Sequence, residues 1–219
     1  MVRHSLQILA QDGYDRAYQG LMPYIDTLAK GSGDADLPWT WGYILHFYHY
    51  HHPWSHRGYI TKKGGAEVVQ DIFWQSVRLW SQGRPRQALY QLGRSIHVLQ
   101  DMFVPHHAGL TARRNHGDYE RYVTHQWRRF APQQGGHYQW HHSFYLPLCG
   151  TIHRLSWERP FDWVDVGAHL SLPWLDALDG ATCPHYHDRF HDATQRLIPD
   201  LLRFTAGYLY RFCCQVGMD

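Results

Sequence analysis

The chain has little charge and none of the long apolar runs that mark a membrane protein. Charged residues make up 18% of its 219 positions, and 21 Lys and Arg against 19 Asp and Glu leave a formal charge of +2. Such a balance gives no broad positive field for nucleic acid, and no run approaches the roughly 18 apolar residues of a bilayer span. The start, Met1 to His4, lacks the apolar run of a secretory signal. As written, the chain is expected in the cytoplasm, or secreted if it is a processed or truncated form.

Cysteine is also scarce. The four cysteines include no Cys-x-x-Cys pair, which disfavours a zinc ribbon or a thioredoxin-type site. A Cys149–Cys183 bridge stays open, whereas the adjacent Cys213 and Cys214 would form a strained disulfide. Four cysteines in a chain of this length do not make a disulfide scaffold.

The periodicity of the apolar residues predicts helices rather than strands. In the segment from Pro85 to about Phe103, leucine and isoleucine recur at spacings of three and four. Similar patterns predict helices over about 5–30 (broken near Gly13 or Pro23 and closed by the glycines at 31 and 33), 66–82, 116–130, 162–179 and 188–214, with loops at 132–136 and 146–160. No segment alternates as a hairpin would. We therefore predict an all-α fold, a single compact multi-helix domain over residues 1–219.

Histidine is the abundant residue: 19 are present, as many as Asp and Glu together. Two His–carboxylate pairs, His97–Asp101 and His116–Glu120, lie four residues apart, so each pair shares one face of a helix and could share a metal ion. Two such pairs are close to what chance alone gives. Their surroundings indicate more, because the first is followed by a proline and by His106 and His107.

Further donors precede these pairs. In chain order the candidate set is Asp34, His46, His97, Asp101, His107, His116 and Glu120. Four imidazoles and three carboxylates from several segments are enough ligands for two or three divalent ions.

At these residues the sequence resembles a family, the zinc-dependent bacterial phospholipases C, which are related to the single-strand-specific zinc nucleases. The matching stretches are DADLPWTWGYILHFY (34–48), ALYQLGRSIHVLQDMFVPHHA (88–108), HGDYE (116–120) and TAGYLYRF (205–212). The resemblance runs from about His4 to Phe212 and is weak across 131–200. It implies a helical fold around a polynuclear zinc cleft.

Carried over residue by residue, the resemblance implies a trinuclear zinc site with a water or hydroxide between the first two ions. One ion would be held by Asp34, His46, His97 and Asp101, and a second by His107, His116 and Glu120. A third would lie between Asp101 and His4. Asp34 is then the candidate general base, and the alternative is that the metal-bound hydroxide attacks unaided.

The chain departs from the family pattern in three places. The family begins with a tryptophan that completes the third metal site, whereas Met1, Val2 and Arg3 precede His4 here, so two ions are expected more firmly than the third. Histidines replace acids just after His46: we interpret the run His49, His51, His52 and His56 as a polar loop near the cleft rather than as a second metal site. Ala35 stands where an aromatic side chain would help to cage a choline group.

The sequence therefore predicts a zinc-dependent phosphodiester hydrolase, most simply one that makes a phospholipase C-type cleavage. The expected substrate is a small-molecule or lipid phosphodiester, with transient contact with a membrane surface, without nucleic acid and without an obligate protein partner. Three alternatives stay open: a zinc nuclease, a family member recruited to tailor a small metabolite by hydrolysis, cyclisation or dehydration, and a metal-binding protein without catalysis.

Overall fold

The computed structural model describes residues 1–37, 48–60, 62–111, 115–146, 150–179 and 185–219. Within them the chain is mostly helical, which confirms the predicted fold class. No helix of this described part is long and apolar enough to span a membrane. The elements are α1 (Val2–Gln11), α2 (Asp15–Leu21), η1 (Met22–Tyr24), α3 (Ile25–Asp34), α5 (Gly65–Ser81), α6 (Pro85–Asp101), α7 (Pro105–Ala108), α8 (His116–Gln126), η3 (Trp127–Arg129), β1 (His141–Leu146), β2 (Thr151–Ser156), α9 (Pro160–Ser171), η4 (Leu172–Trp174), α10 (Leu175–Leu178) and α11 (Tyr186–Val216).

Helix α6 lies between α3 and α5 and packs against both. It begins at Pro85, a residue favoured in the first turn because its missing N–H needs no partner there. Its predicted apolar stripe, Leu89, Leu92, Ile96 and Leu99, is completely buried. Burial of each such side chain stabilises the fold by about 2 kcal/mol, so this stripe holds the helix that carries His97.

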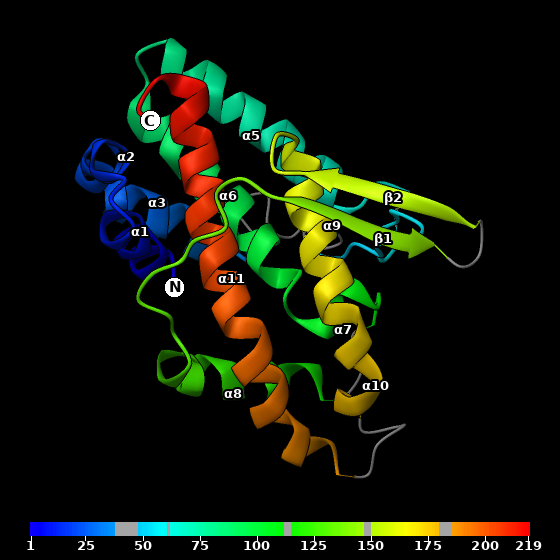
Figure 1. Cartoon of the computed structure of the whole chain (residues 1–219). Helices are drawn as coiled ribbons and strands as arrows, with labels where there is room; N and C mark the ends of the chain where they lie inside the picture. Colours follow the sequence, from blue (N-terminus) through cyan, green and yellow to red (C-terminus); the bar gives the residue numbers. More distant parts are fainter. Residues whose placement is uncertain (38–47, 61, 112–114, 147–149, 180–184) are drawn as a thin grey trace.

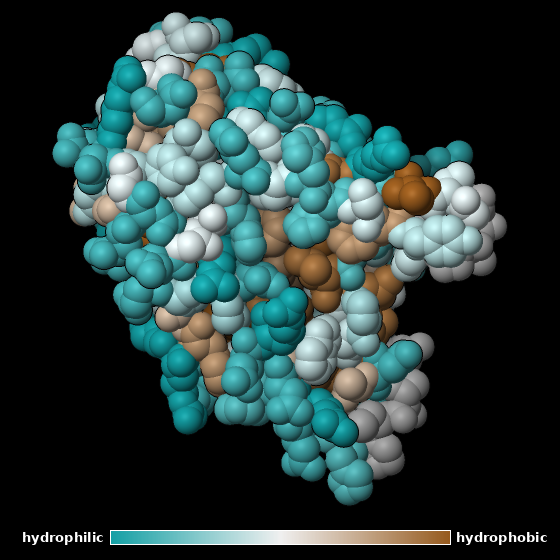
Figure 2. Space-filling view, viewed as in Figure 1, coloured by the Kyte–Doolittle hydropathy of each residue, from teal (hydrophilic) through white to brown (hydrophobic). Residues whose placement is uncertain are grey.

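The longest helix, α11, runs the length of the molecule, with α1 beside it and α9 on its other side (Figure 1). Helix α9 also contacts α5, α6 and α7, so it closes the core from the side of the hairpin. On the face seen in Figure 2, most of the surface is hydrophilic, and apolar side chains gather around α9 and on the projecting hairpin.

The structure corrects the prediction of a loop over 146–160, because β2 lies within that range. Strands β1 and β2 pair antiparallel, with His142 opposite Leu155 and Tyr145 opposite Ile152. Both faces of this hairpin are largely exposed, and Leu155 is the one fully buried side chain of β2. A strand without a continuous buried face lacks the alternation of apolar residues by which sequence analysis recognises strands.

The glycines expected to end the first helical region do not end it: α3 continues through Gly31 and Gly33 to Asp34. The reason lies in helix packing. A Cβ at Gly31 would be 2.1 Å from the carbonyl oxygen of Tyr90, and a Cβ at Gly93 would be 2.2 Å from that of Leu28. The missing side chains therefore let the backbones of α3 and α6 touch.

Cys213 and Cys214 are both free, as their adjacency predicted. Cys149 and Cys183 lie outside the described residues.

We predict that Gly93→Ala lowers the free energy of unfolding by about 1–3 kcal/mol, since the added methyl group overpacks the contact between α3 and α6. Gly33→Ala is the matched control: nothing lies within 4 Å of a Cβ there, and alanine in a helix is about 1 kcal/mol better than glycine. Urea unfolding followed by circular dichroism measures both. Equal effects of the two substitutions would contradict the packing argument.

Candidate metal centre

Four side chains from three segments form a first donor group: Asp36, His49, His97 and Asp101. His97 and Asp101 lie one turn apart at the end of α6, with Nε2 3.4 Å from Oδ2. Asp36 follows the end of α3, and its Oδ1 is 3.3 Å from Nε2 of His97 and 3.4 Å from Nδ1 of His49. His49 is in turn 3.0 Å from Oδ2 of Asp101. The ligand atoms of Asp36, His49 and His97 thus lie within 4.8 Å of one another, and Asp101 adjoins them through the two imidazoles.

A second donor group consists of His107, His116 and Glu120. His116 and Glu120 are neighbours on the first turn of α8, with Nε2 3.0 Å from Oε1. His107, from the short helix α7, places its Nε2 3.2 Å from the same oxygen and 3.0 Å from Nε2 of His116. All three ligand atoms lie within 4.8 Å of one another.

Asp101 joins the two donor groups electrostatically. Burial by itself opposes its charge, but His97 and His107 outweigh burial and hold the pKa of this carboxyl well below its usual value. The pKa of Glu120 is lowered to about 2, because hydrogen bonds from His107 and His116 outweigh the effect of burial. Both carboxylates are therefore ionised throughout the physiological range, which is the state that binds a metal ion.

The orientation of His107 is fixed by the backbone of the segment that carries His49. Its Nδ1 donates to the carbonyl oxygen of His49 at 2.6 Å, and the N–H of His51 donates to the carbonyl of His107 at 3.2 Å. With Nδ1–H bound to a carbonyl, Nε2 is the nitrogen left to ligate a metal ion once a metal replaces its proton. The ring of Tyr50 stacks on the ring of His107, with centroids 4.7 Å apart.

Five of the predicted ligands are brought together in these two groups: His97, Asp101, His107, His116 and Glu120. His46 lies outside the described residues. Two members were not predicted as ligands. Asp36 is two positions after the predicted Asp34, and His49 belongs to the histidine run that we interpreted as a polar loop. Two features of the sequence could have indicated them: the second acid in the stretch Asp34-Ala35-Asp36, and the run of histidines that contains His49.

Asp34 lies at the last position of α3, where its carboxylate accepts hydrogen bonds from Nζ of Lys30 at 2.6 Å and from the hydroxyl of Tyr90 at 3.1 Å. The hydrogen bond from Lys30 outweighs burial and lowers the pKa of Asp34. Asp34 thus contacts Lys30 and Tyr90, and Asp36 is the acid that contacts His49 and His97. The role of Asp34 as a ligand and as the general base stays a prediction.

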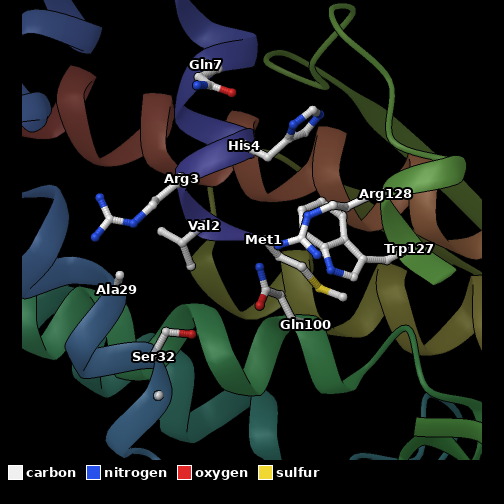
Figure 3. A pocket seen from close by; sticks show the side chains of 11 residues that line it. Met1, Val2, Arg3, His4, Gln7, Ala29, Ser32, Gln100, Trp127 and Arg128 are labelled. Atoms are coloured by element: carbon white, nitrogen blue, oxygen red, sulfur yellow. The ribbon is translucent and has the colours of Figure 1, made fainter. Parts of the chain in front are cut away.

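His4 lies in a separate cavity of about 520 Å³ at the start of α1. Its Nε2 is 2.6 Å from the carbonyl oxygen of Pro132, and its ring meets Trp127 edge-on. In Figure 3 the ring is turned toward the side of Trp127 rather than toward Gln100, the neighbour of Asp101. The structure therefore does not bring His4 to Asp101, and the third ion stays a prediction.

His106 is buried against the second donor group rather than exposed. Its ring stacks on that of His116 with centroids 5.0 Å apart. Burial, together with the neighbouring imidazoles, lowers its pKa to about 4. A neutral ring of this kind keeps water and positive charge away from one side of His116.

The donor chemistry fits zinc. Zinc accepts imidazole nitrogen and carboxylate oxygen without thiolate, in tetrahedral sets of three or four protein ligands. The first donor group supplies two of each, and the second supplies two imidazoles and one carboxylate. The buried Oδ2 of Asp101 makes no hydrogen bond among the described residues. The fold and these donors define a helical protein built around a polynuclear metal centre.

Comparison with known families agrees with this class. The family described as zinc dependent phospholipase C matches residues 1–155. The chain therefore belongs to the zinc-dependent phospholipase C family, which confirms the resemblance seen in the sequence.

Solved structures show the same fold. The chain is similar to an alpha toxin from Clostridium absonum, with a TM-score of 0.80 and 17% identity over 99% of this chain and 62% of the toxin. The alpha-toxin of an avian strain of Clostridium perfringens gives a TM-score of 0.74 and 18% identity over 98% of this chain and 62% of that one. The chain thus corresponds to somewhat under two thirds of each toxin. No curated protein matches it at a significant level.

Comparison of Asp36→Asn with Asp34→Asn tests which carboxylate completes the first donor group. From the distances to His49 and His97 we expect Asp36→Asn to release about one equivalent of zinc after dialysis, whereas Asp34→Asn retains it. Elemental analysis of the purified variants gives the answer. Loss of zinc from Asp34→Asn alone would restore the assignment made from the sequence.

Proposed function

We propose that the protein is a zinc-dependent phosphodiester hydrolase that makes a phospholipase C-type cleavage of a phospholipid. The observation that supports this most directly is the pairing of the two donor groups through Asp101, which lies within electrostatic reach of both His97 and His107. Paired divalent ions would neutralise the phosphate and lower the pKa of a water beside it. The family to which the chain belongs supports the same chemistry.

The residues of the two groups would divide the work. His97, Asp101 and the second donor group hold the ions, and the hydrogen bond from His107 to the carbonyl of His49 keeps one ligand in its productive tautomer. Asp36 is the exposed carboxylate of the first donor group, with 54% of its side chain accessible. It is therefore placed to accept the proton of an attacking water, the role that the sequence suggested for Asp34.

The segment 48–60 supplies a surface for an apolar substrate. Trp54, Tyr59 and Ile60 are exposed, Ile60 to 67%. Tyr59 packs on Tyr50, which stacks on His107, so Tyr59 connects this segment to the second donor group. Large apolar side chains gathered beside a reactive centre are typical of contact with another molecule or a lipid surface. We infer a lipid phosphodiester in a membrane surface rather than a soluble one.

Position 35 offers no aromatic residue to recognise the head group of the substrate. Ala35 is buried, with 4% of its surface accessible, and a methyl group has no π-system with which to cage a quaternary ammonium. Choline would thus lack this recognition element.

Replacement of a ligand in the second donor group tests the function. We expect His116→Ala to lose about one equivalent of zinc and to lower the hydrolysis of bis-p-nitrophenyl phosphate about 100-fold or more. His125→Ala is the matched control, because His125 is an exposed imidazole on the same helix, bonded to the carbonyl of Arg121. Bound zinc is measured by elemental analysis and turnover is followed at 25 °C for both variants. The prediction holds if only His116→Ala loses zinc and activity.

The same experiment separates the alternatives. Turnover of single-stranded DNA in preference to phospholipid vesicles would favour the nuclease. Full zinc content with no turnover of any phosphodiester would favour the metabolite-tailoring enzyme or a protein without catalysis. Full zinc content and full activity in His116→Ala would overturn the site itself.

A second test concerns the lipid surface. We expect Ile60→Ser to lower the hydrolysis of phosphatidylcholine and phosphatidylethanolamine vesicles several-fold, because it removes apolar area worth about 2 kcal/mol when buried, and to leave bis-p-nitrophenyl phosphate turnover unchanged. Met22→Ser is the control: Met22 is 44% exposed, in η1 before the start of α3, whereas Asp36 follows its end. Equal loss on both substrates would contradict a role at the lipid surface.

A further inference from the structure

Apart from the two donor groups, four imidazoles from three parts of the fold surround one buried carboxylate. Asp165 lies on α9 and is completely buried. His51 and His56 come from the segment 48–60, His153 from β2, and His169 from the next turn of α9. We refer to these five residues as the Asp165 cluster.

The imidazoles divide evenly between the two oxygens of Asp165. Nε2 of His51 is 2.8 Å and Nε2 of His56 is 3.5 Å from Oδ1. Nδ1 of His153 is 3.4 Å and Nε2 of His169 is 3.8 Å from Oδ2. Each trio has its three ligand atoms within 4.8 Å of one another.

Most of these distances are too long for hydrogen bonds but suit metal ligands. Oδ2 of Asp165 and the inward nitrogens of His56, His153 and His169 are buried without a hydrogen-bond partner in the part of the chain that the structure describes. Leaving buried polar atoms unpaired costs about 1–3 kcal/mol each. Around a tetrahedral ion with bonds of about 2.0–2.1 Å, neighbouring ligand atoms lie about 3.3 Å apart, close to the spacings found here.

A metal ion would also balance the charge of Asp165. Among the described residues no Lys or Arg pairs with this carboxylate, and its ion-pair partners are the four imidazoles alone. A buried carboxylate without a compensating positive charge is strongly unfavourable. One divalent ion balances a single carboxylate better than two, which would leave a large excess of positive charge in the interior.

The backbone around the cluster is held in an unusual shape that keeps these donors in place. His56 has a φ of 54°, in the left-handed region. Its carbonyl oxygen would be 2.9 Å from a Cβ at Gly64, and Nδ1 of His51 would be 2.5 Å from the same atom. The glycine therefore admits both histidines, and residues in such strained conformations gather at functional sites.

From these observations we propose that the Asp165 cluster binds one divalent transition-metal ion, zinc in the first instance, at a site separate from the two donor groups of the proposed active centre. Asp165 is the common ligand of the two trios. Because its carboxylate ligand is completely buried, the ion would tie the segment 48–60 and β2 to α9. Trp54, whose ring lies 5.3 Å from that of His169, would be fixed with it. The histidine run that the sequence indicated as a polar loop thus contributes two ligands.

The test is the zinc stoichiometry of the full chain after removal of all metal, reloading with zinc chloride and gel filtration. We expect Asp165→Asn to bind at least one equivalent less than the unchanged chain. Asp162→Asn is the matched control, because Asp162 is a buried acid one turn earlier on α9 that pairs with Arg159 and the N–H of Ser156 instead of an imidazole. It should keep the full stoichiometry.

Two milder variants keep the test decisive if Asp165→Asn fails to fold. The first is His153→Ala, at a side chain that is partly exposed. The second is His56→Asn, because asparagine tolerates the left-handed region. Each should change the visible spectrum of the cobalt-loaded protein and weaken zinc retention, while His116→Ala alters a different part of that spectrum. Full zinc content and an unchanged cobalt spectrum in both variants would show that the cluster is only an ion-pair network, whether or not the protein hydrolyses phosphodiesters.

Discussion

The contact between the backbones of α3 and α6 determines where the first donor group can form. Gly31 and Gly93 present no side chain at the crossing, so each helix meets the carbonyl oxygens of the other. Such an approach is available to glycine alone, and it sets the distance between the end of α3, which leads into Asp36, and the end of α6, which carries His97. The second donor group follows from the same helix, because α7 and α8 come next in the chain. A small change in this crossing would separate ligands that must lie within a few ångströms of one ion.

Local pattern made a large part of this arrangement predictable. The apolar stripe of α6 and its starting Pro85 defined that helix, and the i, i+4 spacing of His97 with Asp101 defined a shared face before any tertiary contact was considered. The same holds for His116 and Glu120. These residues needed only the geometry of one helix. The ordered series of ligands then indicated the family without knowledge of how the segments meet.

What could not be predicted depends on segments without periodicity. Asp36 and Asp34 are chemically identical, and only the direction of the chain after α3 and the hydrogen bonds of Lys30 and Tyr90 distinguish them. The ligands around Asp165 are spread over more than a hundred residues and meet through a hairpin whose sequence does not alternate. Their histidines were visible in the composition, but no spacing rule connects them.

The two hydrogen bonds between His107 and the segment 49–51 have a consequence for how the protein takes up its ions. That short segment contributes His49 to the first donor group and His51 to the Asp165 cluster, and His107 belongs to the second donor group. Ordering of the segment by any one ion removes conformational freedom that the other sites would otherwise have to remove themselves. Uptake is therefore expected to be cooperative, with intermediates of partial loading scarcely populated, although no single side chain need touch every ion.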